Sequence, residues 1–336
     1  MAGPTSAPLT DNLALSTCCL GLHPSHTLEA KLSAAAKYGF QGIEIVYGDL
    51  ERYSVVHNLN ITSAANQIRK LCDELKLHIL ALCPFENFEG YPSLLSERLE
   101  TAQRWMTIAR ILGAEYVQVP AQYDTSASTD EATIVTELQA LADLGTATEP
   151  VISIAYEPMG WSIRYSTWES TLRLTSLVNR SNFGICIDTF HIASKIWGDP
   201  SHSSGKYPSG DRELVDSLGR LVREFPLEKL FYIQLSGGEK FSPVYSSTHP
   251  WYLEGEAKEF TWSKHGRPFP LESGYGDYMP VVEITEALFQ TGYKGWVSLE
   301  TFDRRMRVSA YKVETAAERA ESPMTGRSYQ LDTLNK

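Results

Sequence analysis

The sequence predicts an α/β fold, namely a (β/α)8 barrel of the TIM barrel type with a long loop after the seventh strand. Two observations support this prediction. Short apolar runs alternate with longer amphipathic segments from residue 13 to about residue 320. Several of the amphipathic segments end in a glycine that leads through a short turn into the next apolar run, as in "KYGFQGIEI", "ILGAEYVQV" and "TGYKGWVSL".

Eight segments have the pattern of buried strands. They are Leu13–Thr17, Gly42–Val46, Leu77–Cys83, Tyr116–Pro120, Val151–Glu157, Phe183–Asp188, Leu230–Leu235 and Trp296–Glu300. Helical patterns lie between them, at Leu28–Tyr38, Ala64–Leu75, Leu95–Leu112, Thr129–Leu144, Thr167–Val178, Arg212–Phe225, Pro280–Gln290 and Met306–Ala320. A doubly wound open sheet is disfavoured, because the first strand-to-helix turn, "STCCLGLHPSHT", lacks the glycine fingerprint GxGxxG.

Two connections are longer than a barrel needs. Ser236–Gly276 follows the seventh predicted strand and is rich in Pro, Gly, Ser, Trp and Tyr. It leaves the end of the barrel where active sites lie, so we expect a lid or a pocket wall. Gly198–Asp211 is polar and predicts a surface excursion. We expect one barrel domain over residues 13–325, with an N-terminal tail at 1–12 and a C-terminal tail at 326–336.

Composition excludes several classes of protein. The net charge of −11 and the isoelectric point near 5.3 disfavour nucleic acid or an anionic membrane surface as a partner. The five cysteines show no CxxC spacing, which favours buried, reduced thiols. No apolar run reaches the roughly 18 residues of a membrane span, and the N-terminus lacks the pattern of a secretory signal. We therefore expect a cytoplasmic protein.

Four of the predicted strands have a polar residue at or near their C-terminal end. Glu157, Asp188, Gln234 and Glu300 belong to strands five to eight, whose C-terminal ends meet at one mouth of a barrel. Three carboxylates at one mouth repel each other, and a divalent cation removes that conflict. The oxygen-only donor set suits Mg²⁺, Mn²⁺ or a similar hard cation.

Each of the three acids could also have an ordinary structural role instead of binding a metal. Glu157 could pair with Arg164, Asp188 could cap the following helix, and Glu300 could pair with Arg304 or the arginine after it. The metal site is favoured because the pattern recurs on four consecutive strands.

Other residues could complete such a site. His191 lies three residues after Asp188 and is a candidate acid or base. Arg267, in the aromatic "TWSKHGRPF" segment of the long loop, is the preferred partner for an acidic substrate, with Lys264 and Arg164 as runners-up.

Further substrate contacts are expected from three residues: Tyr47, Glu86 and His249. Glu44 could line the pocket or act as an interior acid that supports the ligands.

Six blocks of the sequence are informative together, namely "YGFQGIEIVYGDL", "PFENFEG", "AYEPMGW", "FGICIDTFHIA…GDP", "SSTHPWYLEGEAKEFTWSKHGRPF" and "GWVSLETF". They resemble the fungal 3-dehydroshikimate dehydratases of quinate catabolism, which belong to the xylose isomerase-like TIM barrel superfamily. The resemblance assigns a divalent cation (Mg²⁺, Mn²⁺ or Co²⁺) to Glu157, Asp188, Gln234 and Glu300. It places His191 and Arg267 at the active site. "YEPMGWS" departs from the "YEALAWG" that is typical of the family after the fifth strand.

The resemblance implies conversion of 3-dehydroshikimate, an anionic polyhydroxy ketone, into protocatechuate. A base removes a ring proton, the metal stabilises the resulting enolate, and water is lost, with His191 as the acid or base and Arg267 as the carboxylate clamp. The alternative is an isomerase, epimerase or dehydratase that acts on a keto-sugar, an inosose or a related ketone. A barrel that only binds a ligand is also open, as is a homo-oligomer.

Overall fold

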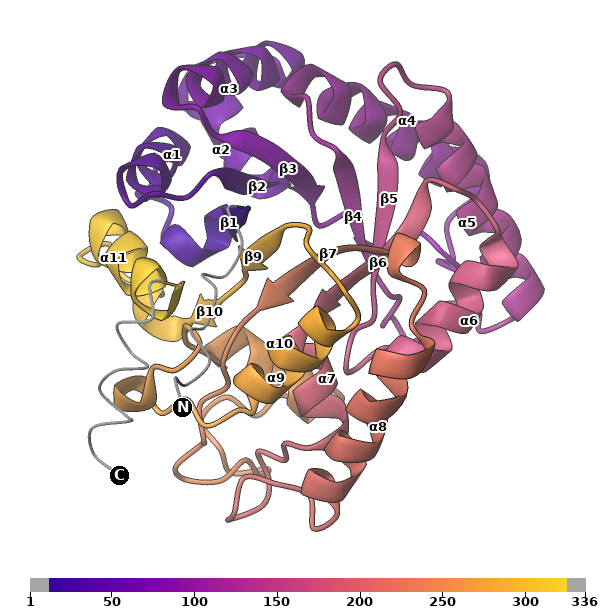
Figure 1. Ribbon diagram of the computed structural model, residues 1–336. Coiled ribbons are helices and arrows are strands. Elements are labelled where there is room, and N and C mark those ends of the chain that lie inside the picture. The colour runs from indigo at the N-terminus through magenta and orange to yellow at the C-terminus, as the bar shows by residue number, and fades with distance from the viewer. Residues whose placement is uncertain (1–11, 325–336) are drawn as a thin grey trace, which may run out of the picture.

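Eight parallel strands close into a barrel within residues 12–324, which are the residues that the computed structural model describes (Figure 1). Their order around the barrel follows the chain, and the last strand pairs with the first. The predicted (β/α)8 barrel is confirmed. The barrel strands are Leu13–Ser16 (β1), Gly42–Val46 (β2), His78–Cys83 (β3), Tyr116–Pro120 (β4), Ser153–Glu157 (β5), Phe183–Asp188 (β6), Leu230–Leu235 (β7) and Val297–Leu299 (β9).

Helices surround the barrel, as Figure 1 shows. They are Leu28–Lys37 (α1), Tyr47–Val56 (α2), Ile61–Leu75 (α3), Leu95–Leu112 (α4), Glu131–Thr146 (α5), Trp168–Val178 (α6), Thr189–Ile196 (α7), Gly210–Glu224 (α8), Lys258–His265 (α9), Val281–Gln290 (α10) and Val313–Met324 (α11). All eight predicted helical segments overlap a helix, whereas α2, α7 and α9 were not predicted. The last helix begins later than expected, because the Asp303 side chain accepts a hydrogen bond from the backbone N–H of Arg305 and starts a short 3-10 turn instead.

Two clusters of apolar side chains form the core. The larger one fills the space between the strands and the helices. The smaller one lies inside the barrel and consists of Ala14, Leu80, Ala81, Ala155, Cys186 and Tyr232. Residues two apart on a strand point the same way, so Ala155, Cys186 and Tyr232 lie directly beneath Glu157, Asp188 and Gln234. The polar strand ends therefore rest on a packed apolar floor.

The long connection after β7, residues 236–276, is called the lid here. It contains α9 and a short strand, Gly266–Arg267 (β8), which pairs antiparallel with Phe302–Asp303 (β10). Glu239 in the lid accepts hydrogen bonds from Arg304 and Arg305, just after β10. The lid is thus fastened to the segment that follows β9, the last barrel strand.

The remaining predictions concern the ends of the chain, the cysteines and the membrane. Both predicted tails lie outside the described residues, apart from Asn12, so the domain limits 13–325 stay a prediction. All five cysteines are buried and free. Among residues 12–324, no helix is long and apolar enough to cross a bilayer.

Candidate active site

The ends of strands β5, β6, β7 and β9 bring four polar side chains to one mouth of the barrel. Asp188 pairs in register with Gln234, and Gln234 pairs with Ser298, two residues before Glu300. The side chains of Glu157, Asp188 and Gln234 are buried, and that of Glu300 is 13% exposed. The backbone N–H of Glu300 bonds to the carbonyl of Leu235, which extends the ladder by one residue beyond β9.

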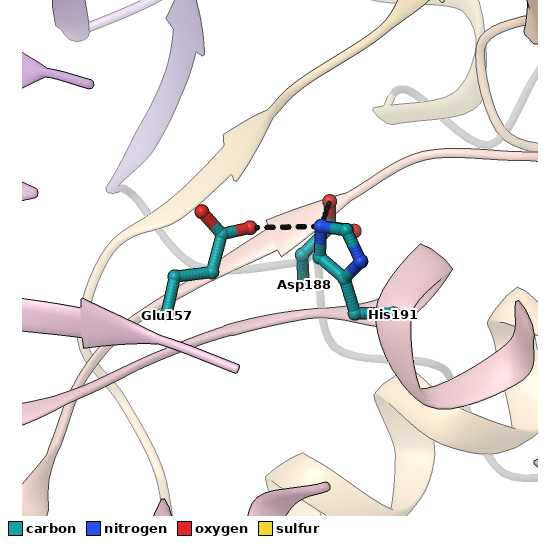
Figure 2. Close-up of side chains that lie close together, drawn as sticks. All are labelled: Glu157, Asp188 and His191. Atoms are coloured by element: carbon teal, nitrogen blue, oxygen red, sulfur yellow. Dashed lines mark ion pairs between the residues drawn. The ribbon is translucent and has the colours of Figure 1, made fainter. Parts of the chain in front are cut away.

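Glu157, Asp188 and His191 form the tightest group at this mouth (Figure 2). His191 Nε2 lies 3.3 Å from Glu157 Oε1 and 3.8 Å from Asp188 Oδ2. One ligand atom from each residue lies within 4.8 Å of the other two. Asp188 also accepts a hydrogen bond from the backbone N–H of Phe190 and so caps α7, as the alternative interpretation expected. Asp188 can cap the helix and still face Glu157 and His191, because Oδ1 accepts the capping hydrogen bond and Oδ2 faces the histidine.

Hydrogen bonding determines which ring nitrogen of His191 carries the proton. Burial lowers the pKa of His191 to about 3, so the ring is neutral near pH 7. The backbone N–H of Gly160 donates to Nδ1 at 3.0 Å, which makes Nδ1 the acceptor and leaves the proton on Nε2. In this arrangement His191 presents an N–H to the carboxylates, so it suits donation to an oxygen that gains negative charge.

The carboxylates of the mouth are poorly neutralised. Burial and then the nearby charge of Asp188 raise the pKa of Glu157 well above its ordinary value. Burial and then the charge of Glu157 do the same to the pKa of Glu300. Among the described residues, Glu157 Oε1 and His191 Nε2 have no hydrogen-bond partner although both are buried. An unpartnered buried carboxylate oxygen beside other crowded acids fits a divalent cation.

Arg267 is the positive charge closest to these acids. Its Nη2 contacts Asp188 Oδ2 and lies 3.2 Å from Glu300 Oε2. Its remaining contacts are with Ser236 Oγ, Ser263 Oγ and the carbonyl of Glu300. The side chain is 1% exposed, and most of its N–H groups bond to the protein. The contacts show Arg267 holding two acids in place, and its role as a clamp for a substrate carboxylate stays a prediction.

The ordinary salt bridges considered for Glu157 and Glu300 do not form. Arg164 pairs with Glu131 at the start of α5. The arginines after β10 pair with Glu239 in the lid. Neither strand-end acid is therefore neutralised by an arginine that is close to it in sequence.

The five residues expected to contact substrate have other partners in the structure. Tyr47 begins α2 and stacks on a tryptophan of α4, and Glu86 accepts a hydrogen bond from a tyrosine hydroxyl at 2.7 Å. Arg164 is more than a third exposed, and its charge is paired at the surface. His249 stacks on a phenylalanine of the lid, and Lys264 pairs with Glu256. The structure records no contact between these five residues and the buried acids, so their roles stay predictions.

Three aromatic residues that sequence reasoning missed connect the site to its surroundings. Trp161 packs edge-on against His191, with ring centroids 4.7 Å apart. Phe260 of α9 packs on Trp161 at 5.0 Å, and Tyr123 packs on Phe260 at 5.4 Å. Lys264 lies over Phe260 at 4.6 Å, so this aromatic wall links the lid to the histidine. The available signals were the aromatic residues of the lid sequence and the tryptophan of "YEPMGWS".

Two further polar residues support the ligand candidates from below. Gln118 on β4, which was not predicted, donates from Nε2 to Glu157 Oε2. Glu44 on β2 is fully buried and accepts a hydrogen bond from Gln234, which agrees with the expectation of an interior acid. Burial raises its pKa.

The chain belongs to the family of xylose isomerase-like TIM barrels, whose pattern matches residues 32–323. A 3-dehydroshikimate dehydratase from Neurospora crassa is 35% identical over 317 residues, which is 89% of this chain and 88% of that protein. A 3-dehydroshikimate dehydratase from Pseudomonas aeruginosa is 30% identical over 85% of this chain but only 38% of its own length.

Solved structures agree with the fold. The IolI protein, which was solved with a bound zinc atom, superimposes with a TM-score of 0.68 at 20% identity and covers 94% of this chain and 97% of its own. At that level of identity the likeness shows the barrel architecture alone.

Proposed function

We propose that this chain is a metal-dependent lyase that dehydrates 3-dehydroshikimate to protocatechuate. The observation that carries the proposal is the buried group of Glu157, Asp188 and His191, in a chain that resembles the Neurospora dehydratase over nearly its whole length. The two Pseudomonas dehydratases support the same substrate, with 30% and 28% identity.

The donor set suits a divalent cation held by Glu157, Asp188, Gln234 and Glu300, with Mg²⁺, Mn²⁺ and Co²⁺ as the candidates. When bound, such a cation polarises a ketone and lowers the cost of placing negative charge on its oxygen. His191 also lies at this mouth, but the proton on its Nε2 makes it a donor here and a poor ligand.

The protein groups then handle protons. A base removes the C–H proton of the ring that the ketone makes acidic, while Glu157 keeps Oε1 for the cation, since its Oε2 accepts a hydrogen bond from Gln118. The electron pair of that C–H bond passes to the ketone oxygen, where the N–H of His191 can donate a hydrogen bond.

The elimination then balances without any other reactant. The C–O bond of a ring hydroxyl breaks, and the hydroxyl leaves as water when it receives the abstracted proton. A final proton shift makes the ring aromatic. Protocatechuate differs from 3-dehydroshikimate by the loss of one molecule of water, so the reaction consumes neither an oxidant nor a reductant.

The decisive experiment follows the ultraviolet absorbance of the aromatic product. Metal-stripped protein reconstituted with Mn²⁺ should convert 3-dehydroshikimate, and a sample with excess chelator should not. His191→Gln should lower kcat by about 10²- to 10⁴-fold, because it removes a positioned donor. Glu137→Gln, which changes a buried acid paired with Arg98 outside the mouth, is the matched control: it should lose stability, but the folded protein should retain activity.

A reconstituted protein that makes no aromatic product would overturn the dehydratase assignment. Turnover of a keto-sugar or an inosose under the same conditions would then support the isomerase, epimerase or inosose dehydratase alternative. Activity that survives complete chelation would overturn the metal mechanism.

A further inference from the structure

The two oxygens of the Glu157 carboxylate have different surroundings. Oε2 accepts a hydrogen bond from Nε2 of Gln118 on β4, whereas Oε1 has no hydrogen-bond partner among the described residues. Both side chains are buried, since Glu157 and Gln118 are each 2% exposed. Because the two oxygens of an ionised carboxylate are chemically equivalent, the surroundings alone decide which of them stays free.

The free oxygen is the one that faces the neighbouring acid and the histidine. Glu157 Oε1 lies 3.3 Å from His191 Nε2, and Asp188 Oδ2 lies 3.8 Å from the same nitrogen. Figure 2 shows Oε1 on the side of the carboxylate that points toward these two residues, with the other oxygen on the far side. One oxygen of each acid therefore faces the same space at the mouth of the barrel.

The Gln118 amide can pair with this carboxylate in only one orientation. An ionised carboxylate accepts hydrogen bonds and does not donate them, so the amide must direct its N–H end at Glu157. The backbone of Gln118 is fixed within β4, where it pairs in register with Ala155, two residues before Glu157. Without this partner the carboxylate could rotate about its last bond and present either oxygen to a cation. Hydrogen bonds from outer groups hold the ligands of many metal sites in this way.

We propose that Gln118 is a positioning residue that holds Oε2 of Glu157, so that Glu157 binds the cation through Oε1 alone. The inference rests on the metal site of the proposed function and adds a determinant of its affinity. Packing alone does not account for Gln118, because an apolar side chain of similar size would fill the same volume without the cost of burying an amide.

The test is the affinity for Mn²⁺ in the absence of substrate, measured by isothermal titration calorimetry on the metal-stripped protein. Gln118→Met keeps the size of the side chain but removes the donor, so Oε2 loses its partner and the carboxylate is free to rotate. We expect the affinity for Mn²⁺ to fall about 10- to 100-fold, as for other residues that orient metal ligands.

Asn182→Leu is the matched control. It also removes a buried amide, whose Nδ2 donates to the backbone carbonyls of Ala142 and Ile152. Asn182 directly precedes β6, so it lies at the opposite end of the barrel from Asp188. This variant should lower the stability of the fold but leave the affinity for Mn²⁺ unchanged.

A double-mutant cycle separates positioning from a general loosening of the barrel. Glu157→Gln weakens the site itself and removes the carboxylate that Gln118 is proposed to orient. In this background Gln118→Met should change the affinity for Mn²⁺ less than about 2-fold, because the two residues act as one unit. Gln118→Asn is a second variant in case Gln118→Met fails to fold. Its amide is one methylene shorter and should not reach Oε2, so the same loss of affinity is expected.

Three outcomes overturn the proposal. The first is an affinity of Gln118→Met or Gln118→Asn that falls no further than that of Asn182→Leu. The second is a loss of the same size in the Glu157→Gln background. The third is a wild type that binds no Mn²⁺, which would overturn the metal site as well. Because no substrate enters the titration, normal Mn²⁺ binding without dehydratase activity would refute the proposed function and leave this inference standing.

Discussion

Replacing Arg267 by methionine should destabilise the protein strongly without metal and much less with it. Methionine keeps the length and apolar stem but removes the charge that lies between Asp188 and Glu300. The guanidinium is 1% exposed, so its loss leaves buried acids uncompensated. Removing one partner of a buried ion pair costs about 3 to 5 kcal/mol. A divalent cation supplies positive charge to the same acids and should offset much of that cost.

The assay is urea unfolding followed by tryptophan fluorescence, with and without saturating Mn²⁺. The wild type should gain about 2.7 kcal/mol at a metal concentration 100 times the dissociation constant. The cost of Arg267→Met should fall from about 3 to 5 kcal/mol to below about 2 kcal/mol when Mn²⁺ is present. Arg319→Met is the matched control, since Arg319 is also buried between two acids, Glu272 and Asp303, in another part of the fold.

The control variant should lose the same free energy of unfolding in both conditions. An equal cost of Arg267→Met with and without Mn²⁺ would refute the reasoning, because it would mean that the cation and the arginine do not serve the same acids.

Three further predictions concern other parts of the molecule. Burial raises the pKa of Glu89 from 4.5 to about 7. The protonated Glu89 side chain therefore makes its full contribution to the stability of the fold below pH 4.5, and this contribution is lost as the pH rises through 7 and the side chain ionises. Glu89→Gln should therefore gain about 2 to 3 kcal/mol relative to the wild type between pH 5 and pH 8 in urea unfolding, and a constant gap would contradict this. Glu239→Gln weakens the contacts of the lid with Arg304 and Arg305, so amide hydrogen exchange near residue 239 should accelerate about 5- to 30-fold, whereas unchanged exchange would count against the lid anchor. Phe260→Ala should raise KM for 3-dehydroshikimate about 5- to 10-fold with little change in kcat, and a loss confined to kcat would exclude its role as a pocket wall.

The sequence was sufficient to predict the barrel and the residues at its mouth, because both follow from local periodicity. Glu157 and Asp188 end apolar strands, and the C-terminal ends of barrel strands converge regardless of loop detail. Helix α7 was not among the predicted helical segments, because its sequence lacks such a periodicity. Residues Thr189–Ser194 are all buried, so no polar face reveals the helical period.

Contacts between distant strands could not be predicted. The support of Gln234 by Glu44 joins residues 190 positions apart, and it depends on the stagger of the closed barrel. Sequence proximity also suggested the wrong partner for Arg164, which reaches Glu131 on the preceding helix. The tautomer of His191 follows from the position of one backbone N–H, that of Gly160, which no side-chain pattern encodes.

Pairing between β8 and β10 has a consequence for protein engineering. The strand that carries Arg267 belongs to the lid and contributes nothing to the hydrogen bonds of the barrel itself. The loop that covers the site therefore also supplies the charge that balances its acids. A designer who exchanges this loop for another changes coverage and electrostatics together. A graft without a basic residue at this position would leave the charges of Asp188 and Glu300 to a bound cation alone.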